Sequence, residues 1–474
     1  MYTQEFIAIG CYFLFLLAIG FFSYQKQMSA SGFILGNRSM NSWLTALAAH
    51  ASDMSSWLFM AYPAAIFTKG VIGTWTAIGL IICMYLNWRI IAPKIRVATE
   101  KFNSMTFSSF FESRFKDNSG WIRVFSALVI IVFYTIYISA GLTTLGCTLE
   151  LLFKLKYVVG VVIGLMIVVP YVFSGGYLTL AWIDLCQGLF LMCVIIAIPL
   201  CLLPQVGGWS AISDSLVLNN LTSHLLPDFS GTTIISIISL AFGWGLGYFG
   251  QPHIVTKFMG IKNVSDIPTS KWIGMTWMVL SLGAATLVGL VGIAFFNGQL
   301  ANPELVLIEM VKKSFSPLIL GFVLCAIIAA AINAMSSQIL VLSSSLAEDL
   351  YKKLWRTHAS SKEILFISRM GILLVTCVAF LIAFRQTNTI YELVLYAWSG
   401  IGASFGPLVI LSLYAKKTNK YGAWAGILTG GITSALWPLF DKTLAPLIPG
   451  FFLSMLSIVA ISYLTRHKLS HNVQ

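Results

Sequence analysis

Charged residues are scarce in this chain of 474 residues. Asp, Glu, Lys and Arg make up only 10% of it, whereas hydrophobic residues make up 58%. Ordinary soluble domains contain about 25% charged residues, so a chain this poor in charge cannot cover its surface with polar groups. Apolar runs of about 20 residues, the length that spans a bilayer, recur from end to end. The composition excludes a soluble protein and predicts a polytopic protein in the lipid bilayer.

The sequence also lacks the signatures of metal sites and of several enzyme classes. The eight cysteines contain no Cys-x-x-Cys pair and are expected to be buried small hydrophobes without a disulfide framework. The histidines have no metal-ligand spacing, and there is no phosphate-binding loop, dinucleotide fingerprint or nucleophile elbow. These absences predict that the chain is not an enzyme, holds no cofactor and does not drive transport with ATP by itself.

Polar breaks divide the apolar runs into about thirteen predicted spans of bilayer length. The first run follows Glu5 without a basic residue before it or a cleavage site after it. It is therefore expected to be a retained helix and not a signal peptide. The predicted spans are 6–23, 40–67, 71–93, 122–148, 157–175, 179–203, 231–250, 272–296, 317–346, 365–384, 390–414, 421–438 and 447–465.

Basic residues are distributed unevenly over the loops. The formal net charge is +12, but Lys and Arg are spread over several short loops, which suits membrane orientation better than nucleic acid. With the N-terminus outside, most of them face the cytoplasm, as the positive-inside rule requires, and the loop 204–230 without Lys or Arg lies outside. We predict an outside N-terminus, an inside C-terminus and no nucleic-acid partner. Two predicted cytoplasmic loops carry Lys94, Arg96, Lys101, Arg114, Lys116 and Arg123, and Lys352, Lys353 and Arg356.

The segment 243–253 carries four glycines and a proline inside an apolar run. Glycine weakens a helix and proline removes a hydrogen-bond donor, so a lipid-facing helix gains nothing from them. Backbone that leaves its helix at membrane depth is tolerated only where it is packed in protein or lines a polar cavity. The segment therefore predicts a binding site halfway across the membrane, which is typical of a transporter.

The second predicted span, 40–67, is irregular as well, because it places a carboxylate and several hydroxyls at mid-membrane. The two irregular spans lie five spans apart. That spacing is typical of an all-α transporter with inverted repeats and a site at the repeat interface. We expect spans 2–6 (about 40–203) and 7–11 (about 231–414) to form the repeats, with spans 1, 12 and 13 peripheral. Together they form one transmembrane domain, 1–474.

Asp53 is the strongest candidate site residue. A carboxylate inside a membrane is costly unless it is paired, hydrated or coordinated. Asp53 therefore either caps the irregular helix or helps to bind a cation or an ammonium group. Unwound carbonyls and nearby hydroxyls suit a hard cation such as Na⁺. His50 lies three residues earlier on nearly the same helical face, and is either hydrogen-bonded in the bundle or a proton carrier.

Four aromatic residues, Trp57, Tyr137, Trp244 and Tyr248, lie on or near the irregular segments. Each either packs in the core or contacts a ligand. Ring faces attract ammonium groups, and freed backbone can hold a carboxylate. Asn, Gln, Asp and Glu are few in the predicted spans, so a small zwitterion suits such a site better than a sugar.

Two further charged residues lie near the predicted cytoplasmic face. Asp184 begins a span and is either a helix-end carboxylate or a ligand on an exit path. Arg38 follows a short turn and is expected to be an inside anchor or a gate. For Arg38 the anchor is the favoured role, whereas both roles of Asp184 stay open.

Three segments carry a family resemblance: Ala-Ser-Asp-Met-Ser at 51–55, the Gly-rich segment 243–253, and Tyr-Ala-Trp-Ser-Gly at 396–400. With them the chain resembles the sodium/solute symporter family, and within it the bacterial sodium/proline symporter branch, over nearly its whole length. The resemblance implies thirteen spans in the LeuT-type 5+5 inverted repeat, with broken helices in spans 2 and 7. It also implies secondary-active import of L-proline with Na⁺ by alternating access across a bacterial cytoplasmic (inner) membrane. We expect the monomer to be functional.

The resemblance implies roles for individual residues. Asp53 matches the family's essential intramembrane aspartate, and Ser56 stands where the branch usually has a glycine, which narrows the pocket. The other matching positions are Trp57, Tyr137, Trp244, Tyr248 and Pro252 in the proline pocket, Arg38 and Asp184 among the coupling residues, and the carbonyls of Ala51, Met54 and Ala331 in the sodium site.

The chain departs from the family where two adjacent hydroxyl residues complete the sodium site. Asn333 and Ala334 stand there; the amide of Asn333 can supply an oxygen, whereas Ala334 supplies none. His50 stands where the branch has a small residue. Two coupling ions therefore remain open: Na⁺ bound with the help of Asn333, or H⁺ carried by Asp53 and His50. The remaining alternatives are uncoupled or exchange transport, transport of another small amino acid or an organic acid, and a transporter-like solute sensor.

Overall fold

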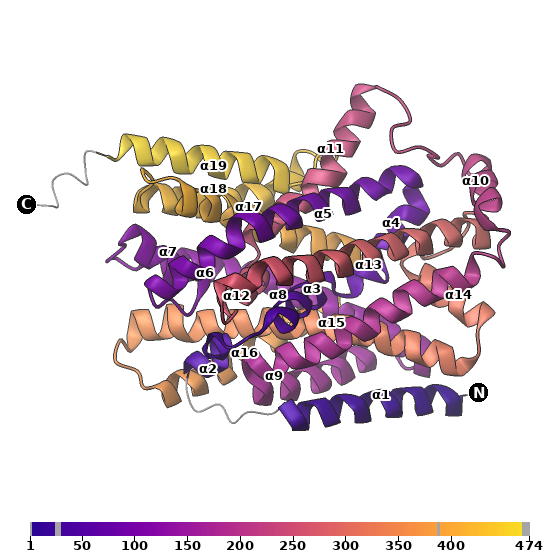
Figure 1. The fold of residues 1–474 in the computed structure, drawn as a ribbon, viewed down its shortest axis with the longest axis horizontal. Coiled ribbons are helices and arrows are strands. Elements are labelled where there is room, and N and C mark those ends of the chain that lie inside the picture. The colour runs from indigo at the N-terminus through magenta and orange to yellow at the C-terminus, as the bar shows by residue number, and fades with distance from the viewer. Residues whose placement is uncertain (1, 24–29, 386–388, 467–474) are drawn as a thin grey trace, which may run out of the picture.

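The fold is built from helices that run side by side in one bundle (Figure 1). The computed structural model describes residues 2–23, 30–385 and 389–466. Within these ranges there is no β-strand, only two isolated backbone bridges. Nine of the described helices are long and apolar enough to cross a membrane. The all-α, polytopic class predicted from the composition is therefore confirmed.

The long helices correspond closely to the predicted spans. Most ends differ from the prediction by a few residues, which is the usual uncertainty of a helix end. The helices are α1 (Tyr2–Ser23), α3 (Ser42–Met54) with α4 (Ala61–Lys69), α5 (Trp75–Leu86) with α6 (Ala92–Lys101), α8 (Trp121–Phe153), α9 (Tyr157–Leu202), α11 (Gly231–Gly245), α13 (Ile267–Phe296), α15 (Pro317–Ser344), α16 (Ser361–Phe384), α17 (Ile390–Tyr414), α18 (Lys420–Leu436) and α19 (Leu447–Leu464).

The remaining predicted spans are shorter or interrupted helices, so the count of thirteen stays a prediction. The apolar part of α1 is Ile7–Leu16, and the apolar first part of α9 is Tyr157–Pro170. Within α9 the backbone leaves the helical region at Gly176, with φ 66° and ψ 174°, so two helices meet there. α3 and α4 are each too short to cross a bilayer, because about 20 helical residues are needed.

Several segments predicted as loops are helical. Lys94, Arg96 and Lys101 lie on α6, which continues α5 through a π-helical turn, and Arg114 lies on a further helix. The charges mark where the chain leaves the apolar layer, but intrahelical hydrogen bonds carry the helix beyond that point. The additional helices are α2 (Ala30–Leu35), α7 (Phe107–Phe115), α10 (Gly208–Leu218), α12 (Pro252–Met259), α14 (Val306–Ser314) and the π-helical extension η8 (Ser345–Trp355) of α15.

The two Gly-, Ser- and Pro-containing segments leave their helices. α3 ends at Met54, and Ser55 has φ 46° and ψ −168° before the short 3₁₀ turn η2 (Ser56–Leu58). α11 passes into the 3₁₀ turn η5 (Leu246–Gly250), and Gln251 is extended, with φ −79° and ψ 109°, before α12. Peptide groups at both interruptions are thereby freed from the regular helical pattern.

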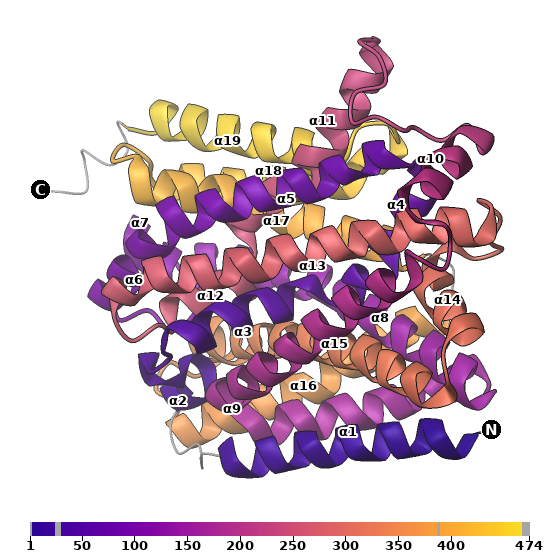
Figure 2. The ribbon, with the colours of Figure 1, turned by 45° about the vertical axis from the view of Figure 1, so that its right-hand side comes forward.

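The described chain begins and ends at opposite ends of the bundle (Figures 1 and 2). α1 starts at the end that carries α10 and α14, whereas α19 finishes at the end that carries α6 and α7. Residue 1 and residues 467–474, which the orientation prediction also concerns, lie outside the described residues. α15 and α17 form the interior, since 78% of the residues in the apolar window of each are buried.

α5 and α11 approach each other through glycine. A Cβ added at Gly79 would lie 2.1 Å from the backbone oxygen of Ala241, and one added at Gly245 would lie 2.5 Å from the oxygen of Gly79. Backbone, unlike a flexible side chain, cannot move aside easily, so this contact requires residues without a side chain. It fixes the position of the interrupted helix α11 against α5.

We expect Gly79→Ala to destabilise the protein by about 1–3 kcal/mol, because the added methyl forces the two backbones apart. Gly283→Ala is the matched control, since a Cβ added at Gly283 on α13 meets nothing within 4 Å. Thermal unfolding in detergent, followed by tryptophan fluorescence, measures both. Equal melting temperatures for the two variants would contradict this account of the α5–α11 contact.

Candidate functional site

A small cavity lies between the interrupted helices. It is bordered by the end of α3, η2, α5, α8, the end of α11, η5 and α17. The volume open to a water molecule is about 20 Å³. One water needs roughly 10–15 Å³ on the same measure, so an amino acid fits only after the walls move apart. The lining residues are Asp53, Met54, Trp57, Leu80, Tyr137, Trp244, Tyr248 and Trp398.

Asp53 and Tyr248 connect the two interruptions. The Tyr248 hydroxyl donates a hydrogen bond to Oδ2 of Asp53 over 2.5 Å. Both side chains are buried, and no ion pair within the described ranges involves Asp53. The backbone oxygen of Tyr248 accepts from Nδ2 of Asn87 at 2.9 Å, which holds η5 against the turn after α5. A buried carboxylate that faces a cavity without a cationic partner is suited to a positively charged ligand.

Aromatic rings form most of the cavity wall. The ring centroid of Trp57 lies 4.9 Å from that of Trp244 and also 4.9 Å from that of Tyr62, on which it stacks. Nε1 of Trp398 donates to the backbone oxygen of Trp244 at 2.8 Å, and the Trp398 ring stands edge-on to Tyr248. Indole Nε1 of Trp57 has no hydrogen-bond partner among the described residues. The wall therefore offers ring faces and one free donor.

The structure brings five of the predicted substrate residues to one cavity and leaves two outside it. Ser56 exchanges a hydrogen bond with Thr144 at 2.8 Å, and Pro252 is buried as the first residue of α12. Leu80 and Trp398 line the cavity but were not among the predicted residues. Trp398 belongs to the segment 396–400 that carried the family resemblance, so a signal for it existed. An ordinary leucine such as Leu80 gives no signal in the sequence.

His50 is not among the residues that line this cavity. It is fully buried, and its Nε2 lies 3.1 Å from Nε1 of Trp88, which can only donate. The His50 ring also lies 6.1 Å from the ring of Trp277, between centroids, and a Cβ added at Gly274 would lie 2.4 Å from the His50 side chain. His50 therefore packs from α3 against α13. Although Asp53 and His50 are one helical turn apart, the structure gives them different neighbours.

The positions predicted to bind a cation lie on helices that pack together. α15 contacts both α3 and η2, which brings the helix of Ala331 and Asn333 beside the helix end with Ala51 and Met54. Asn333 is fully buried, and neither atom of its amide has a hydrogen-bond partner among the described residues. A buried amide left unpaired costs about 1–3 kcal/mol. A cation could satisfy Oδ1 of Asn333 but not its Nδ2, and the side chain of Ala334 has no ligand atom; the cation site at these positions stays a prediction.

The two charged residues near the predicted cytoplasmic face are held by strong contacts. Oδ2 of Asp184 accepts from Nζ of Lys257 at 3.1 Å in a buried ion pair that joins α9 to α12. Arg38 donates to the backbone oxygens of Met259 at 2.8 Å and of Ser104 at 2.9 Å. These contacts are those of an anchor between α12 and its neighbours. The predicted roles of Arg38 and Asp184 in coupling stay predictions.

Comparisons with known proteins identify relatives over almost the entire chain. A sequence model of the sodium:solute symporter family matches residues 33–430. The high-affinity proline transporter PutP of Bacillus subtilis is 42% identical over 458 residues, which cover 95% of this chain and 96% of that relative. Sodium/proline symporter 2 of Staphylococcus saprophyticus is 39% identical, with coverage of 98% and 93%. Both relatives match nearly end to end.

Solved structures show the same fold at low sequence identity. The substrate-bound, outward-open Na⁺-coupled sialic acid symporter has a TM-score of 0.82 at 19% identity, and the match covers 97% of this chain and 98% of that one. A nucleobase-cation-symport-1 family transporter in a closed conformation has a TM-score of 0.56 at 14% identity. These likenesses confirm that the chain shares the all-helical fold of the two transporters. The five-plus-five repeat and the boundaries of its halves stay predictions.

The Tyr248–Asp53 hydrogen bond generates a stability prediction. Tyr248→Phe leaves the buried carboxylate without its donor, which should cost about 1–3 kcal/mol of unfolding free energy. In an Asp53→Ala background the same change should cost much less, because the acceptor is absent. Thermal unfolding of the two single variants and the double variant in detergent gives the coupling energy. Strictly additive effects would show that the two side chains do not interact.

Proposed function

This chain belongs to the sodium:solute symporter family, and we propose that it imports L-proline with Na⁺ across a bacterial cytoplasmic membrane. Members of this family are symporters and not enzymes, so the prediction that the chain is not an enzyme is confirmed. One observation carries the proposal: residues of two interrupted helices, far apart in the sequence, line a single cavity whose wall holds one carboxylate and five aromatic rings. The names of the two proline-transporting relatives support the substrate.

Proline is the kind of ligand that such a cavity accommodates. Its protonated secondary amine carries a positive charge that Asp53 can balance, and its apolar ring can lie against Trp57 and Trp244 once these rings move apart. Freed peptide N–H groups at the interruptions, and the unpartnered Nε1 of Trp57, are donors for a carboxylate. A sugar would require several side-chain acceptors and donors, and Asp53 and Tyr248 are bonded to each other. Ser56 and Pro252 do not line the cavity, so their proposed effect on proline binding would be indirect.

Na⁺ is the better-supported coupling ion. The unpaired amide of Asn333 supplies an oxygen, and carbonyls of Ala51, Met54 and Ala331 complete the proposed site. A proton carrier must bind and release H⁺ at the transport site. His50 accepts from Trp88 through Nε2 and lies outside the cavity, so protonating it would break that bond without reaching the substrate. Asp53 would have to act alone.

We further propose the thirteen-span, five-plus-five architecture for this chain. α3 with α4 would be span 2, interrupted at Ser55, and α11 with η5 would be span 7, interrupted before Gln251. Repeat one would run from about 40 to 203 and repeat two from about 231 to 414, within a single domain. Each repeat then opens with an irregular helix, and the cavity lies where the two openings meet.

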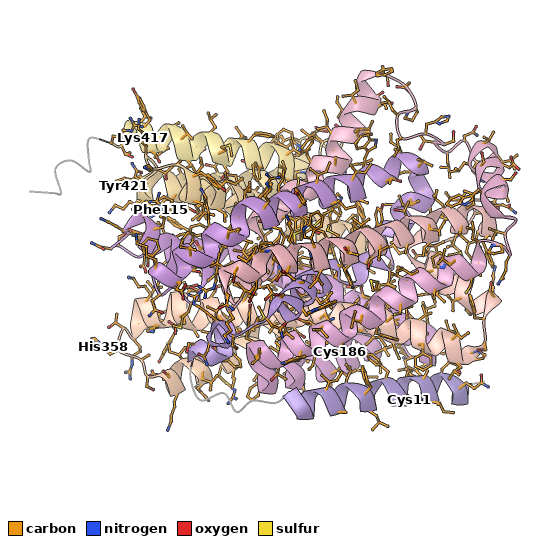
Figure 3. The ribbon with its side chains drawn as sticks, in the orientation of Figure 1. Cys11, Phe115, Cys186, His358, Lys417 and Tyr421 are labelled. Carbon is orange, nitrogen blue, oxygen red and sulfur yellow. The ribbon has the colours of Figure 1, made fainter. Side chains whose placement is uncertain are left out.

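The proposed orientation places the end with α6 and α7 in the cytoplasm. Figure 3 shows Lys417 and His358 at that same end, together with Phe115 of α7. Basic residues gather there on α6, on α7 and on η8, as the positive-inside rule requires. We also propose that the monomer is functional. Arg38 and the Asp184–Lys257 ion pair would hold α12 against its neighbours at the cytoplasmic end until the bundle opens.

The proposed function is tested by uptake of labelled proline into proteoliposomes. We expect uptake under an inward Na⁺ gradient without a pH gradient, and no uptake under a pH gradient without Na⁺. Asp53→Asn should abolish uptake, whereas His50→Gln should retain Na⁺ dependence. Uptake driven by H⁺ alone would show that the coupling ion is H⁺ and not Na⁺. Absence of proline uptake under both gradients would show that proline is not the substrate.

Restoring the hydroxyl pair tests the cation site. The double substitution Asn333→Ser with Ala334→Thr supplies two hydroxyl ligands, so the Na⁺ concentration for half-maximal uptake should fall about tenfold, equivalent to about 1.4 kcal/mol. Asn333→Ala removes the only side-chain ligand and should shift that concentration in the opposite direction. Proline uptake is measured as a function of Na⁺ concentration for the wild type, the double variant and Asn333→Ala. An Asn333→Ala variant with unchanged Na⁺ dependence would place the cation elsewhere.

A further inference from the structure

Two more cavities continue from the proposed substrate cavity towards the predicted cytoplasmic end. The inner cavity is bordered by Tyr177, His253, Lys257, Ser337 and Leu340, among others. The ring of His253 stands edge-on to Tyr137, with 6.4 Å between centroids, and Tyr137 lines the substrate cavity. These two rings therefore form the partition between the substrate cavity and the inner cavity.

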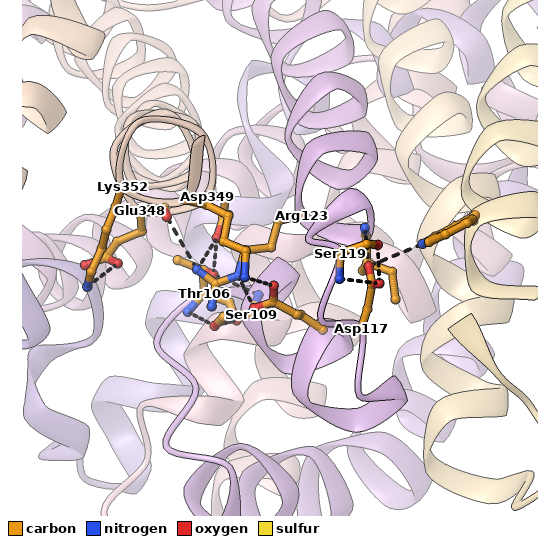
Figure 4. A network of polar contacts seen from close by, with 12 residues as sticks. Thr106, Ser109, Asp117, Ser119, Arg123, Glu348, Asp349 and Lys352 are labelled. Carbon is orange, nitrogen blue, oxygen red and sulfur yellow. Dashed lines mark hydrogen bonds and ion pairs between the residues drawn. The ribbon is translucent and has the colours of Figure 1, made fainter. Parts of the chain in front are cut away.

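The third cavity opens at the surface, and its volume is about 370 Å³. Met105 and Thr106 line both this surface cavity and the inner cavity, so they form the second partition. Oγ1 of Thr106 donates to Asp349 at 2.9 Å, and Arg123 approaches Asp349 and Glu348 (Figure 4). The ring contact between Tyr137 and His253, and the shared residues Met105 and Thr106, thus place the three cavities in succession.

The proton arrangement on His253 can be read from its partners. The Tyr134 hydroxyl oxygen accepts from the backbone N–H of His253 at 3.1 Å and lies 2.8 Å from its Nδ1. Within the described part of the chain, that hydroxyl hydrogen has no other acceptor, so it is donated to Nδ1. The neutral ring then carries its own hydrogen on Nε2. Nε2 is buried without a partner, and His253 lines the inner cavity.

Two further donors border the same space. Ser337 is 4% exposed, and its hydroxyl has no partner in the described ranges. Lys257 donates to Asp184 over 3.1 Å, but an ammonium group has three hydrogens, so donors remain for a ligand. Buried donors without partners are costly and are usually satisfied by a ligand or an ordered water. Although Asp184 balances the charge of Lys257, the remaining ammonium hydrogens add to these donors, and a carboxylate can accept from all of them.

We propose that His253 Nε2–H, the Ser337 hydroxyl and Lys257 form a second, transient site for the carboxylate of the substrate on its way to the cytoplasm. The proposal rests on the proposed import of proline. The volume of the inner cavity open to water is about 20 Å³, so the carboxylate enters when the Tyr137–His253 partition opens. The Thr106–Asp349 bond closes the cavity towards the surface until the amino acid moves on.

Ser337→Ala tests this site, and Ser336→Ala is its matched control. Ser336 lies next to Ser337 on α15 and is also buried, but its hydroxyl donates to the backbone oxygen of Ile332 and does not line the cavity. Na⁺-dependent proline transport is measured in right-side-out and in inside-out membrane vesicles. For Ser337→Ala we expect the half-saturating proline concentration on the cytoplasmic face to rise about three- to tenfold, the effect of one lost hydrogen bond. The value on the outer face should stay unchanged.

A pair of His253 variants provides a second measurement. His253→Asn keeps an acceptor near Nδ1 for Tyr134 but loses the donor in the inner cavity, whereas His253→Gln keeps an N–H close to Nε2. The half-saturating proline concentration on the cytoplasmic face should rise for His253→Asn and should rise less for His253→Gln. Proline transport with Ser337→Ala indistinguishable from Ser336→Ala on both faces would overturn the second site alone. A wild-type protein that moves no proline from either face would overturn the proposed function as well.

Discussion

The hydrogen bond from Tyr248 to Asp53 is the contact on which the rest of the site depends. It joins the interruption after α3 to the interruption after α11, two segments separated by nearly two hundred residues. A carboxylate at the centre of a membrane helix costs about 3 kcal/mol, and here a single hydroxyl is its observed donor. The two interruptions are therefore held together by a group that also has capacity for a positively charged ligand. In the proposed transporter the interrupted helices would form the site, and this bond would hold its two sides together.

The observed cavity is narrow because aromatic rings close over it. Trp57, Trp244 and Trp398 form a connected wall, and the free volume is about that of one water. Under the proposed function, binding would have to separate these rings, so part of the interaction energy of the ligand would go into opening the bundle. A cation bound between α3 and α15 would bias the same movement, because it holds the broken end of α3. Coupling between ion and solute then follows from shared elements, without a direct contact being required.

The sequence predicted the parts of the molecule that have a strong local cause. Apolar length located the long helices, and Gly243 to Pro252 marked an interruption, because such a run weakens a helix. Asp53 was conspicuous as a carboxylate in an apolar run. The sequence did not predict that Lys257 pairs with Asp184, that Leu80 lines the cavity, or that His50 turns towards Trp88. Those features depend on which helices become neighbours, and apolar spans of similar length carry no information about partners. The basic loops predicted around Arg96 and Lys352 proved helical, because charge marks the membrane boundary and not the end of a helix.

The central claim is that Asp53 and the broken helices bind proline and Na⁺ as one coupled site. It is tested most directly by calorimetric titration of the purified protein with proline, in NaCl and in choline chloride of equal concentration. The account predicts that Na⁺ lowers the dissociation constant of proline by about tenfold or more, a coupling free energy in the usual range of 1–3 kcal/mol, and that Asp53→Asn removes this difference. Equal dissociation constants in the two salts, or an Asp53→Asn variant that retains the difference, would contradict it.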